Sequence, residues 1–370
     1  MSSADVIVIG AGIVGAACAD ALSAEGLRVV IVESGAVAGG ATAAAMGHVV
    51  VMDDSEAQMA LTRYARGLWR SLAPALPTEV EFDTAGTLWL AADEDELRLV
   101  RAKAVSYAAH GVAAEELDPA ALARAEPNLR PGLAGALLVP GDIVLSAQAA
   151  AQWLVNRARE RGSELRVADV ASIEAGGVRF ADGSGFSAGT VVCAAGTSTT
   201  LLIPEARVRP RKGHLALTGR LPGFAHHQLV ELGYLRSAHG ADAESVAFNI
   251  QPRRNGQVVI GSSRQFGVAD PAVEAPILRR LLSRAAEYMP SLAGCEILRA
   301  WTGFRGATAD NLPLIGPCPG RRGVFVAAGH EGLGITTSLA TAAMLTDLIQ
   351  GRTPAIDPAP YLPSRFLVKS

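Results

Sequence analysis

A glycine-rich segment near the start of the chain has the residue types and the spacing that bind a dinucleotide. Gly10, Gly12 and Gly15 form a G-x-G-x-x-G pattern. The pattern follows the apolar run 5–9, which is typical of a buried parallel strand, and opens a predicted helix over 16–25. Gly10 would allow a tight turn, Gly12 would admit backbone N–H groups to a pyrophosphate, and Gly15 would let the helix lie close to the strand.

An acidic residue completes this pattern. The second predicted strand, 27–32, is followed by Glu33, whose carboxylate could accept hydrogen bonds from ribose hydroxyls and would repel a 2′-phosphate. Because both strands, the helix and the acid stand in register, the sequence predicts a βαβ dinucleotide-binding unit. A tight turn that binds nothing is the alternative interpretation of the glycines. The pattern does not distinguish NAD from FAD.

A second glycine-rich segment, near the end of the chain, helps to distinguish FAD from NAD. A predicted strand over 323–329 leads through Gly332 and Gly334 into a helix that begins at Ile335. A last strand and helix that return to the first βαβ unit are typical of flavoproteins, since a second helix N-terminus can stabilise negative charge on the flavin pyrimidine ring. Ile335 and Thr336 would offer N–H groups there. We therefore expect FAD; an ordinary βα loop is the alternative.

The remaining periodicity predicts further helices and strands. The predicted helices cover 55–73, 93–111, 146–161, 275–288 and 335–349, and the main further strands cover 81–90, 164–170, 190–196, 211–218, 246–250, 257–261 and 295–302. Asn255-Gly256 is a strong hairpin turn between two of these strands. The chain leaves the nucleotide-binding segment twice and returns to it.

This order predicts an α/β protein with two intertwined domains. We expect a Rossmann-like FAD-binding domain, similar to that of glutathione reductase, with an inserted mixed-sheet α+β substrate domain. The discontinuous FAD-binding domain is expected over 1–80, 140–205 and 297–370. The substrate-binding domain is expected over 81–139 and 206–296.

Composition excludes several classes of protein. The chain has 370 residues, of which 49% are hydrophobic and 19% charged, so general disorder is excluded. A formal net charge of −3 and the lack of a basic stripe argue against nucleic acid as a partner. No apolar run reaches about 18 residues, so no membrane span is expected.

Four cysteines and the N-terminus suggest where the protein works. The cysteines are Cys18, Cys193, Cys295 and Cys318, and none forms a C-x-x-C pair. The sequence therefore predicts no disulfide framework and no metal site. Because the N-terminus carries no basic region before its apolar run, no secretory signal is expected, and a reducing, cytoplasmic setting is the default.

Four ordered segments together resemble the D-amino-acid oxidase family of FAD amine oxidoreductases, which includes glycine oxidase and sarcosine oxidase. They are 8–15 with Glu33, 190–196, 301–316 and 328–334, and the resemblance spans essentially the whole chain. Such a resemblance implies that flavin takes a hydride from the carbon next to a substrate amine, which leaves an imine.

Two segments resemble a narrower group. Residues 45–55 and 329–337 look like the FAD subunits of multi-subunit, dye-linked dehydrogenases, such as D-hydroxyproline dehydrogenase and hydrogen cyanide synthase. This implies a D-amino or imino acid as the small-molecule substrate, with cis-4-hydroxy-D-proline as the specific expectation. Electrons would pass to a dye or to partner subunits carrying an iron–sulfur cluster, FMN or a second flavin, because this chain has no cluster-binding cysteine spacing. The alternatives are an oxygen-using oxidase of glycine or sarcosine type, and a flavin-holding assembly subunit whose partner contains the reactive site.

The resemblance also implies roles for individual residues. Arg305 occupies the position of a carboxylate-binding arginine, and a guanidinium can hold a carboxylate through two hydrogen bonds; a salt bridge at the domain surface is the alternative. His48 is expected near the isoalloxazine, where it could orient or deprotonate the amine; a packing histidine is the alternative. His214 is interpreted as structural.

The full set of expected cofactor-binding residues lies in the segments described above. It consists of Gly10, Gly12, Ile13, Val14, Gly15, Glu33, Ser34, Ala43, Gly47, His48, Val170, Ala195, Gly196, Arg305, Gly329, His330, Gly332, Leu333, Gly334, Ile335 and Thr336. No cysteine matches a covalent attachment point, so non-covalent FAD is expected.

Two positions depart from the glycine-oxidase pattern. The loop before the last helix reads His330-Glu331-Gly332 where such oxidases carry a second arginine, and Asn249 stands where they carry a carboxylate-binding tyrosine. Tyr234 could supply a replacement phenol. Both departures favour a different clamp or a cyclic imino acid.

Overall fold

The computed structural model describes residues 3–232 and 244–366, so Tyr234 lies outside the described residues. The chain forms two compact units. Unit 1 comprises Met1–Val80, Ser146–Pro210 and Phe304–Ser370, and unit 2 comprises Glu81–Leu145 and Arg211–Gly303. Each unit is built from separate stretches of sequence.

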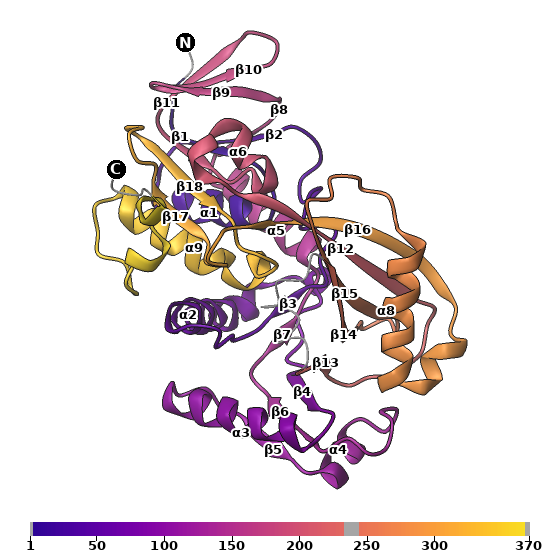
Figure 1. Ribbon diagram of the computed structural model, residues 1–370. Coiled ribbons are helices and arrows are strands. Elements are labelled where there is room, and N and C mark those ends of the chain that lie inside the picture. The colour runs from indigo at the N-terminus through magenta and orange to yellow at the C-terminus, as the bar shows by residue number, and fades with distance from the viewer. Residues whose placement is uncertain (1–2, 233–243, 367–370) are drawn as a thin grey trace. The chain divides into compact units, whose positions relative to one another are not determined.

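Unit 1 is built on a largely parallel sheet (Figure 1). Its strands, in spatial order, are β17 (Leu314–Pro317), β18 (Val324–Ala328), β11 (Gly185–Cys193), β1 (Ser3–Ile9), β2 (Val29–Glu33) and β8 (Glu164–Val167). The central strand β1 pairs in parallel with β2 and β11, which is the arrangement of a βαβ unit. Two further strands, β10 (Gly177–Phe180) and β9 (Val170–Glu174), extend from β11 by antiparallel pairing.

Helices cover this sheet because its strands are apolar on both faces. The helices of unit 1 are α1 (Ile13–Ala24), α2 (Glu56–Leu72), α5 (Ala147–Glu160), α6 (Thr199–Leu202) and α9 (Gly334–Ile349), and the short strand β3 covers His48–Val49. Ile7 and Ile31 are fully buried, as expected of a parallel strand packed on both sides. Helix α1 packs against both α5 and α9.

Unit 2 contains a mixed sheet of eight strands. Their spatial order is β16 (Ile297–Ala307), β12 (Arg209–Thr218), β15 (Val258–Phe266), β14 (Glu244–Pro252), β13 (Gln228–Glu231), β4 (Thr87–Ala91), β6 (Gly135–Val139) and β5 (Glu115–Leu117). Strands β13 and β4 are parallel, while β14 pairs antiparallel with both β13 and β15. The unit also contains β7 (Ile143–Val144) and the helices α3 (Glu94–Ala109), α4 (Pro119–Ala125) and α8 (Ala275–Tyr288).

Helix α8 covers one face of the unit 2 sheet, along β14 and β15 (Figure 1). Its buried Leu281 and Tyr288 belong to the same apolar cluster as Leu229 and Ile250. The rings of Phe248 and Tyr288 stack with their centroids 4.5 Å apart. This face of the sheet is therefore a hydrophobic core.

The structure confirms the expected α/β class, with a Rossmann-like βαβ unit and a separate mixed sheet. The strand expected over 164–170 is wrong in its end point, because β8 stops at Val167. Val167 pairs with Glu33, the last residue of β2, so the chain beyond it has no neighbour to continue the pairing and turns into β9.

The strand expected over 81–90 begins later, at Thr87, where its pairing with both β13 and β6 begins. Gly86 has a φ of +72°, so the preceding residues cannot continue the extended backbone.

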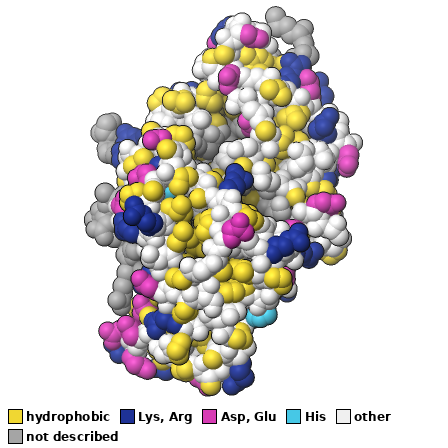
Figure 2. All heavy atoms as spheres, turned by 90° about the vertical axis from the view of Figure 1, so that its right-hand side faces the viewer, with side chains coloured by type: hydrophobic (Ala, Val, Ile, Leu, Met, Phe, Trp, Pro, Cys, Tyr) yellow, Lys and Arg dark blue, Asp and Glu magenta, His cyan; other side chains and the backbone are white. Residues whose placement is uncertain are grey.

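The surface carries both signs of charge. On the face drawn in Figure 2, Lys and Arg side chains stand singly or in small groups among Asp and Glu. Across the described ranges, no helix has both the length and the apolar character needed to cross a membrane.

Candidate functional site

The turn after β1 brings three backbones together more closely than side chains would allow. Gly10 has a φ of +101°, and a Cβ atom there would lie 2.6 Å from the carbonyl oxygen of Ala194. A Cβ atom at Gly15 would lie 2.0 Å from the carbonyl oxygen of Gly10. Helix α1 can therefore start directly against the ends of β1 and β11 only because both positions are glycine.

The first turn of α1 presents backbone N–H groups that no side chain of its own caps. Gly12 occupies the N-cap position and has no side chain to accept a hydrogen bond. The N–H of Ile13 donates to Oγ1 of Thr42, 3.0 Å away, and Thr42 is buried. The sequence interpretation missed Thr42; the signal was a hydroxyl within the small-residue run 39–47. A helix N-terminus of this kind favours an anion.

Glu33 holds the glycine turn from the other side. Its Oε2 accepts the N–H of Ala11 at 2.7 Å, and its Oε1 accepts the N–H of Gly35 at 2.9 Å. A carboxylate offers about four acceptor positions, and these two bonds occupy two of them. Ser34 follows Glu33 directly. The carboxylate thus both fixes the turn and keeps the capacity expected of a ribose-binding acid.

A second helix N-terminus lies beside the first. Helix α9 begins at Gly334, and its N-cap residue, Leu333, provides no side-chain cap. A Cβ atom at Gly334 would lie 3.8 Å from Cγ2 of Val14 in the first turn of α1. Unit 1 therefore places two helix N-termini whose N-cap residues provide no side-chain cap next to each other, which suits a ligand with two groups that carry negative charge.

The loop before α9 is held close to the strand that carries Arg305. Gly332, with a φ of +82°, would place a Cβ atom 3.2 Å from Cδ of Arg305. The N–H of Glu331 donates to the carbonyl of Gly306 at 2.9 Å. A Cβ atom at Gly329, where φ is +80°, would lie 2.5 Å from Cγ2 of Thr308. The Arg305 side chain is therefore placed over the glycine loop that opens α9.

His48 is tied to the start of α9 through its backbone. Oγ1 of Thr336 donates to the carbonyl of His48 at 3.1 Å and accepts the N–H of Val50 at 3.3 Å. The indole of Trp69 donates to the carbonyl of Ile335 at 3.1 Å. These bonds hold the short strand β3 and helix α2 against the N-terminus of α9.

The imidazole of His48 is neutral at physiological pH. Burial, and then the positive charge of Arg305, lower the pKa of His48 from 6.5 to about 4. Its Nδ1 is enclosed and has no hydrogen-bond partner within the described part of the chain. A neutral ring nitrogen without a protein partner is able to accept a hydrogen bond from a bound molecule.

Two other histidines have protein partners. Burial lowers the pKa of His330 to about 4, and its Nε2 lies 3.1 Å from Oγ1 of Thr341. In unit 2, Nε2 of His214 accepts the N–H of Glu274 at 3.0 Å, and Nδ1 lies 3.0 Å from Oγ of Ser263. Both rings therefore serve packing and hydrogen bonding within the protein.

The remaining expected residues also lie in unit 1. Val170 opens β9 and packs, with Ala195, on the cluster that contains Ile9 and Val32. Gly196 begins the short 3₁₀ helix after β11, next to the Arg305 strand: a Cβ atom at Gly306 would lie 3.8 Å from the carbonyl carbon of Gly196.

Ala43 and Gly47 follow Thr42 in the loop that leads to His48. Ala43 donates its N–H to the carbonyl of Gly40 at 3.1 Å, and Gly47 has a φ of +115°. The whole expected cofactor-binding set thus falls in unit 1.

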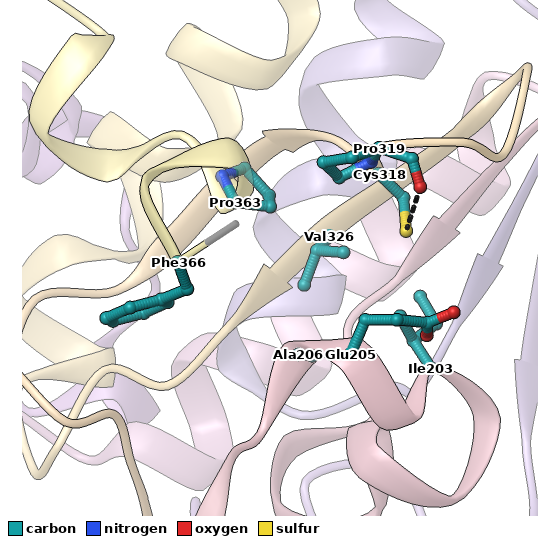
Figure 3. Close-up of a pocket in the computed structure, with 8 residues that line it drawn as sticks. All are labelled: Ile203, Glu205, Ala206, Cys318, Pro319, Val326, Pro363 and Phe366. Carbon is teal, nitrogen blue, oxygen red and sulfur yellow. Dashed lines mark hydrogen bonds between the residues drawn. The ribbon is translucent and has the colours of Figure 1, made fainter. Parts of the chain in front are cut away.

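Figure 3 shows a small pocket in unit 1 that does not involve these residues. Its lining is Ile203, Glu205, Ala206, Cys318, Pro319, Val326, Pro363 and Phe366. Its volume of about 20 Å³ has room for roughly one water molecule. It is too small to hold an amino acid.

The fold and the site together define a class of protein. A family model described as FAD dependent oxidoreductase (DAO) matches residues 5–348. The chain belongs to this family, and FAD is its cofactor. The structure contains features that fit FAD: two adjacent helix N-termini whose N-cap residues provide no side-chain cap, glycines where a Cβ atom would clash, and a carboxylate at the end of β2 that accepts the N–H of Ala11 in the glycine turn. Which side chains contact FAD, and that it is bound non-covalently, stay predictions.

Individual relatives are enzymes and enzyme subunits. The chain is 30% identical to the glycine oxidase of Geobacillus kaustophilus, over 99% of this chain and 98% of that protein. It is 27% identical to the hydrogen cyanide synthase subunit HcnC of Pseudomonas aeruginosa, over 98% and 96%. It is 29% identical to the D-amino acid dehydrogenase of Xanthobacter autotrophicus, over 83% and 73%.

A crystal structure of glycine oxidase from Geobacillus kaustophilus superposes with a TM-score of 0.89 and 28% identity, over 99% of both chains.

Proposed function

We propose that this enzyme oxidises a D-amino or imino acid, and specifically cis-4-hydroxy-D-proline. The observation that carries the proposal is that a neutral His48 lies close enough to Arg305 for the guanidinium charge to lower its pKa, near the N-terminus of α9. Amino-acid oxidation agrees with the names of the glycine oxidase and D-amino acid dehydrogenase relatives. We also propose that unit 1 binds FAD and that unit 2 carries the substrate-recognition surface.

In this proposal Arg305 binds the substrate carboxylate. A guanidinium can donate two parallel hydrogen bonds to a carboxylate, which fixes the orientation of the carbon that carries the amine. The close approach of Gly332 to Cδ and Nε of Arg305 limits where the guanidinium can go. Binding of the carboxylate by Arg305 thereby aligns the reacting C–H bond.

His48 acts on the nitrogen end of the substrate. Because the pKa of His48 is about 4, the ring is unprotonated at neutral pH and Nδ1 is able to accept an amine N–H. An amine that donates to Nδ1 keeps its lone pair on nitrogen available, which the loss of hydride requires. When bound, FAD accepts that hydride from the carbon next to the nitrogen.

The departures from the glycine-oxidase pattern support an imino acid. The second arginine of that pattern is replaced by His330-Glu331-Gly332, and burial keeps the pKa of His330 at about 4, so its ring supplies no positive charge at neutral pH. With one arginine at these positions, the carboxylate is held from one side, which leaves more room for a ring.

Electrons then pass to a dye or to partner subunits that carry an iron–sulfur cluster, FMN or a second flavin. The support is that HcnC, which has similar sequence along nearly its whole length, is named as a subunit of a larger enzyme. An oxygen-using glycine oxidase is the second candidate, supported by the 30% identical glycine oxidase. Oxygen uptake during turnover separates the two.

The deciding experiment is the visible spectrum of the purified protein under argon during addition of cis-4-hydroxy-D-proline. Bleaching of the flavin band within the turnover time would support the proposal. A protein that stays yellow with this acid but bleaches with glycine or sarcosine would favour the oxidase. A protein that stays yellow with every amino and imino acid would contradict both.

A further inference from the structure

Three consecutive hydroxyl residues lie in the first turns of helix α9, and one of them bonds differently from the other two. Oγ1 of Thr337 donates to the carbonyl of Leu333 at 2.8 Å, and Oγ of Ser338 donates to the carbonyl of Ile335 at 3.0 Å. Such bonds back to the preceding turn are common for hydroxyl residues inside a helix. The hydroxyl of Thr336 instead donates to a residue 288 positions earlier in the chain.

The Thr336 hydroxyl bridges two backbone groups of the segment that carries His48. It donates to the carbonyl of His48 at 3.1 Å and accepts the N–H of Val50 at 3.3 Å. In an extended chain these two groups point to the same side, as they do toward one residue of a parallel neighbouring strand. The Thr336 side chain therefore acts as a strand neighbour on this side of β3.

This bridge lies in a part of unit 1 that is closed to water. The exposed fractions are 0% for Thr336 and Val49 and 4% for Val50. Replacement of the hydroxyl by a methyl group would take the bridging partner away from the His48 carbonyl and the Val50 N–H. Because buried backbone groups without a partner destabilise a protein, β3 would have to move to regain hydrogen bonds.

The ring of His48 depends on this backbone for its position. Its Nδ1 is enclosed and has no hydrogen-bond partner among residues 3–232 and 244–366. Since no group in those ranges holds this nitrogen, the place of the ring follows from its rotamer and from the backbone of β3. The Thr336 hydroxyl fixes that backbone, and so it determines where Nδ1 meets a bound molecule.

A separate hydrogen bond holds helix α9 itself. Trp69 is fully buried, and its indole N–H donates to the carbonyl of Ile335 at 3.1 Å. Trp69 belongs to α2, which packs along α9. Loss of the Thr336 hydroxyl should therefore release β3 and leave the N-terminus of α9 in place.

We propose that Thr336 is a positioning residue for the reaction, whose hydroxyl holds the His48 imidazole in place to receive the substrate amine. This inference rests on the proposed amino-acid oxidation and adds a residue that acts through His48. Because the substrate carboxylate is assigned to Arg305, the hydroxyl of Thr336 should affect how the amine is oriented and not how tightly the substrate binds.

The first test compares Thr336→Val and Thr336→Ser with the parent holoenzyme. Valine keeps the branched shape of threonine and removes the hydroxyl, whereas serine keeps the hydroxyl. The rate of flavin reduction is measured under argon at increasing concentrations of cis-4-hydroxy-D-proline. Thr336→Val should lower the limiting rate about tenfold or more and leave the apparent substrate Kd within about twofold. Thr336→Ser should recover most of the lost rate.

Thr337→Val is the matched control. It removes a buried hydroxyl from the same turn of α9, but one that donates to Leu333 within the helix. Its limiting rate should stay within about twofold of the parent value. A fall as large as that in Thr336→Val would mean that any change in this turn slows the reaction, and it would overturn the inference.

The midpoint potential of the flavin shows which element the hydroxyl acts on. A helix N-terminus near the flavin stabilises the negative charge of its reduced form. Because Trp69 holds α9, Thr336→Val should keep the parent potential and the parent FAD content. A more negative potential in Thr336→Val would mean that the hydroxyl acts on α9 and not on His48, which would also overturn the inference.

The pKa of His48 gives a readout that needs no substrate. Burial, and then the charge of Arg305, lower this pKa from 6.5 to about 4. If β3 moves in Thr336→Val, the ring becomes less enclosed and its pKa should rise toward 6.5, whereas Thr337→Val should keep the parent value. NMR titration of holoenzyme labelled in its histidine rings measures the pKa, and His48→Asn identifies the signal among the seven histidines.

These measurements separate a failure of this inference from a failure of the proposed function. If the pKa of His48 stays low in Thr336→Val, the hydroxyl does not position the ring and the inference falls, whatever the substrate is. If the pKa rises but the rate of flavin reduction is unchanged, the inference falls while the oxidation stands. If no amino or imino acid reduces the flavin of the parent enzyme, the proposed function falls and the role in the reaction falls with it.

Discussion

At the scale of single residues, burial sets the charge of the two histidines at the candidate site. His48 and His330 are both held neutral by burial, and Arg305 adds to the effect on His48. Asp310 behaves differently: burial would raise its pKa, but hydrogen bonds from Arg365 and neighbouring groups hold the pKa below its usual value. The site thus combines neutral imidazoles with a permanently charged guanidinium. An imidazole can accept a hydrogen bond from an amine, and a guanidinium can bind a carboxylate.

Arg305→Ala tests the carboxylate clamp. We expect kcat/KM to fall about 100-fold, which corresponds to roughly 3 kcal/mol of lost transition-state stabilisation, while FAD stays bound. Steady-state kinetics and the flavin spectrum measure the two effects separately. The control is Arg179→Ala, which removes an exposed arginine paired with Glu174 and should leave kcat/KM unchanged. Near-normal kcat/KM in Arg305→Ala would remove the clamp from the mechanism.

The lowered pKa of His330 predicts how the free energy of unfolding depends on pH. Its pKa is lowered from 6.5 to about 4 in the folded protein, so between these values the unfolded chain binds more protons. The free energy of unfolding should therefore fall as the pH drops from about 6.5 to about 4, by roughly 3 kcal/mol for this residue, and should show no contribution from it above pH 7.

Urea unfolding of His330→Asn over this pH range measures the contribution. The variant should show a flatter pH dependence than the parent protein, because the Asn side chain does not titrate over this range. An unchanged slope in His330→Asn would mean that this ring does not resist protonation.

At the scale of elements, the start of α1 depends on a close approach between helix and strand. Two glycines permit this approach, and Oγ1 of Thr42, from a distant loop, accepts the N–H of Ile13 in the first turn. Sequence spacing identified the glycines because the turn geometry demands them locally. It could not identify Thr42, because residue 42 reaches Ile13 only after the chain has folded.

Gly15→Ala should abolish FAD binding and destabilise unit 1. Its added methyl group would lie 2.0 Å from the carbonyl oxygen of Gly10, so α1 would have to move away from β1. The yield of yellow protein and the melting temperature report the two effects. Gly67→Ala is the matched control, since Gly67 is exposed within α2 with open space around it, and it should stabilise the protein by about 0.5–1 kcal/mol. Full FAD content in Gly15→Ala would contradict the close approach.

At the scale of the whole molecule, unit 1 is assembled from three separate stretches of chain. The glycine turn belongs to the first stretch, Ala195 to the second, and Arg305 with α9 to the third. A ligand that contacts all three stretches stabilises their association, because it binds the folded unit and not the separated segments.

Removal of FAD should therefore lower the melting temperature. At free FAD about a thousand times its dissociation constant, the expected stabilisation is roughly 4 kcal/mol. Thermal unfolding of the apoprotein, with and without added FAD, measures this effect, and added NAD is the control. Equal melting temperatures with and without FAD would show that FAD does not bind the folded unit in solution.

The sequence by itself determined the features that follow local rules. The βαβ unit, its glycine turn, the acid at the end of β2, the return through α9 and the α/β class were predicted from spacing and periodicity, because turn geometry and strand burial leave their mark on neighbouring residues. The family also followed from ordered motifs.

Only the tertiary structure determined which polar groups are left without partners. It showed that Nδ1 of His48 is enclosed and unpaired among the described residues, and that Asn249 of β14 comes to lie opposite Val230 of β13. Strand register and burial arise from contacts between residues far apart in sequence, so no local pattern could reveal them. The residue types were visible in the sequence, but the missing partners that make them candidate binding groups were not.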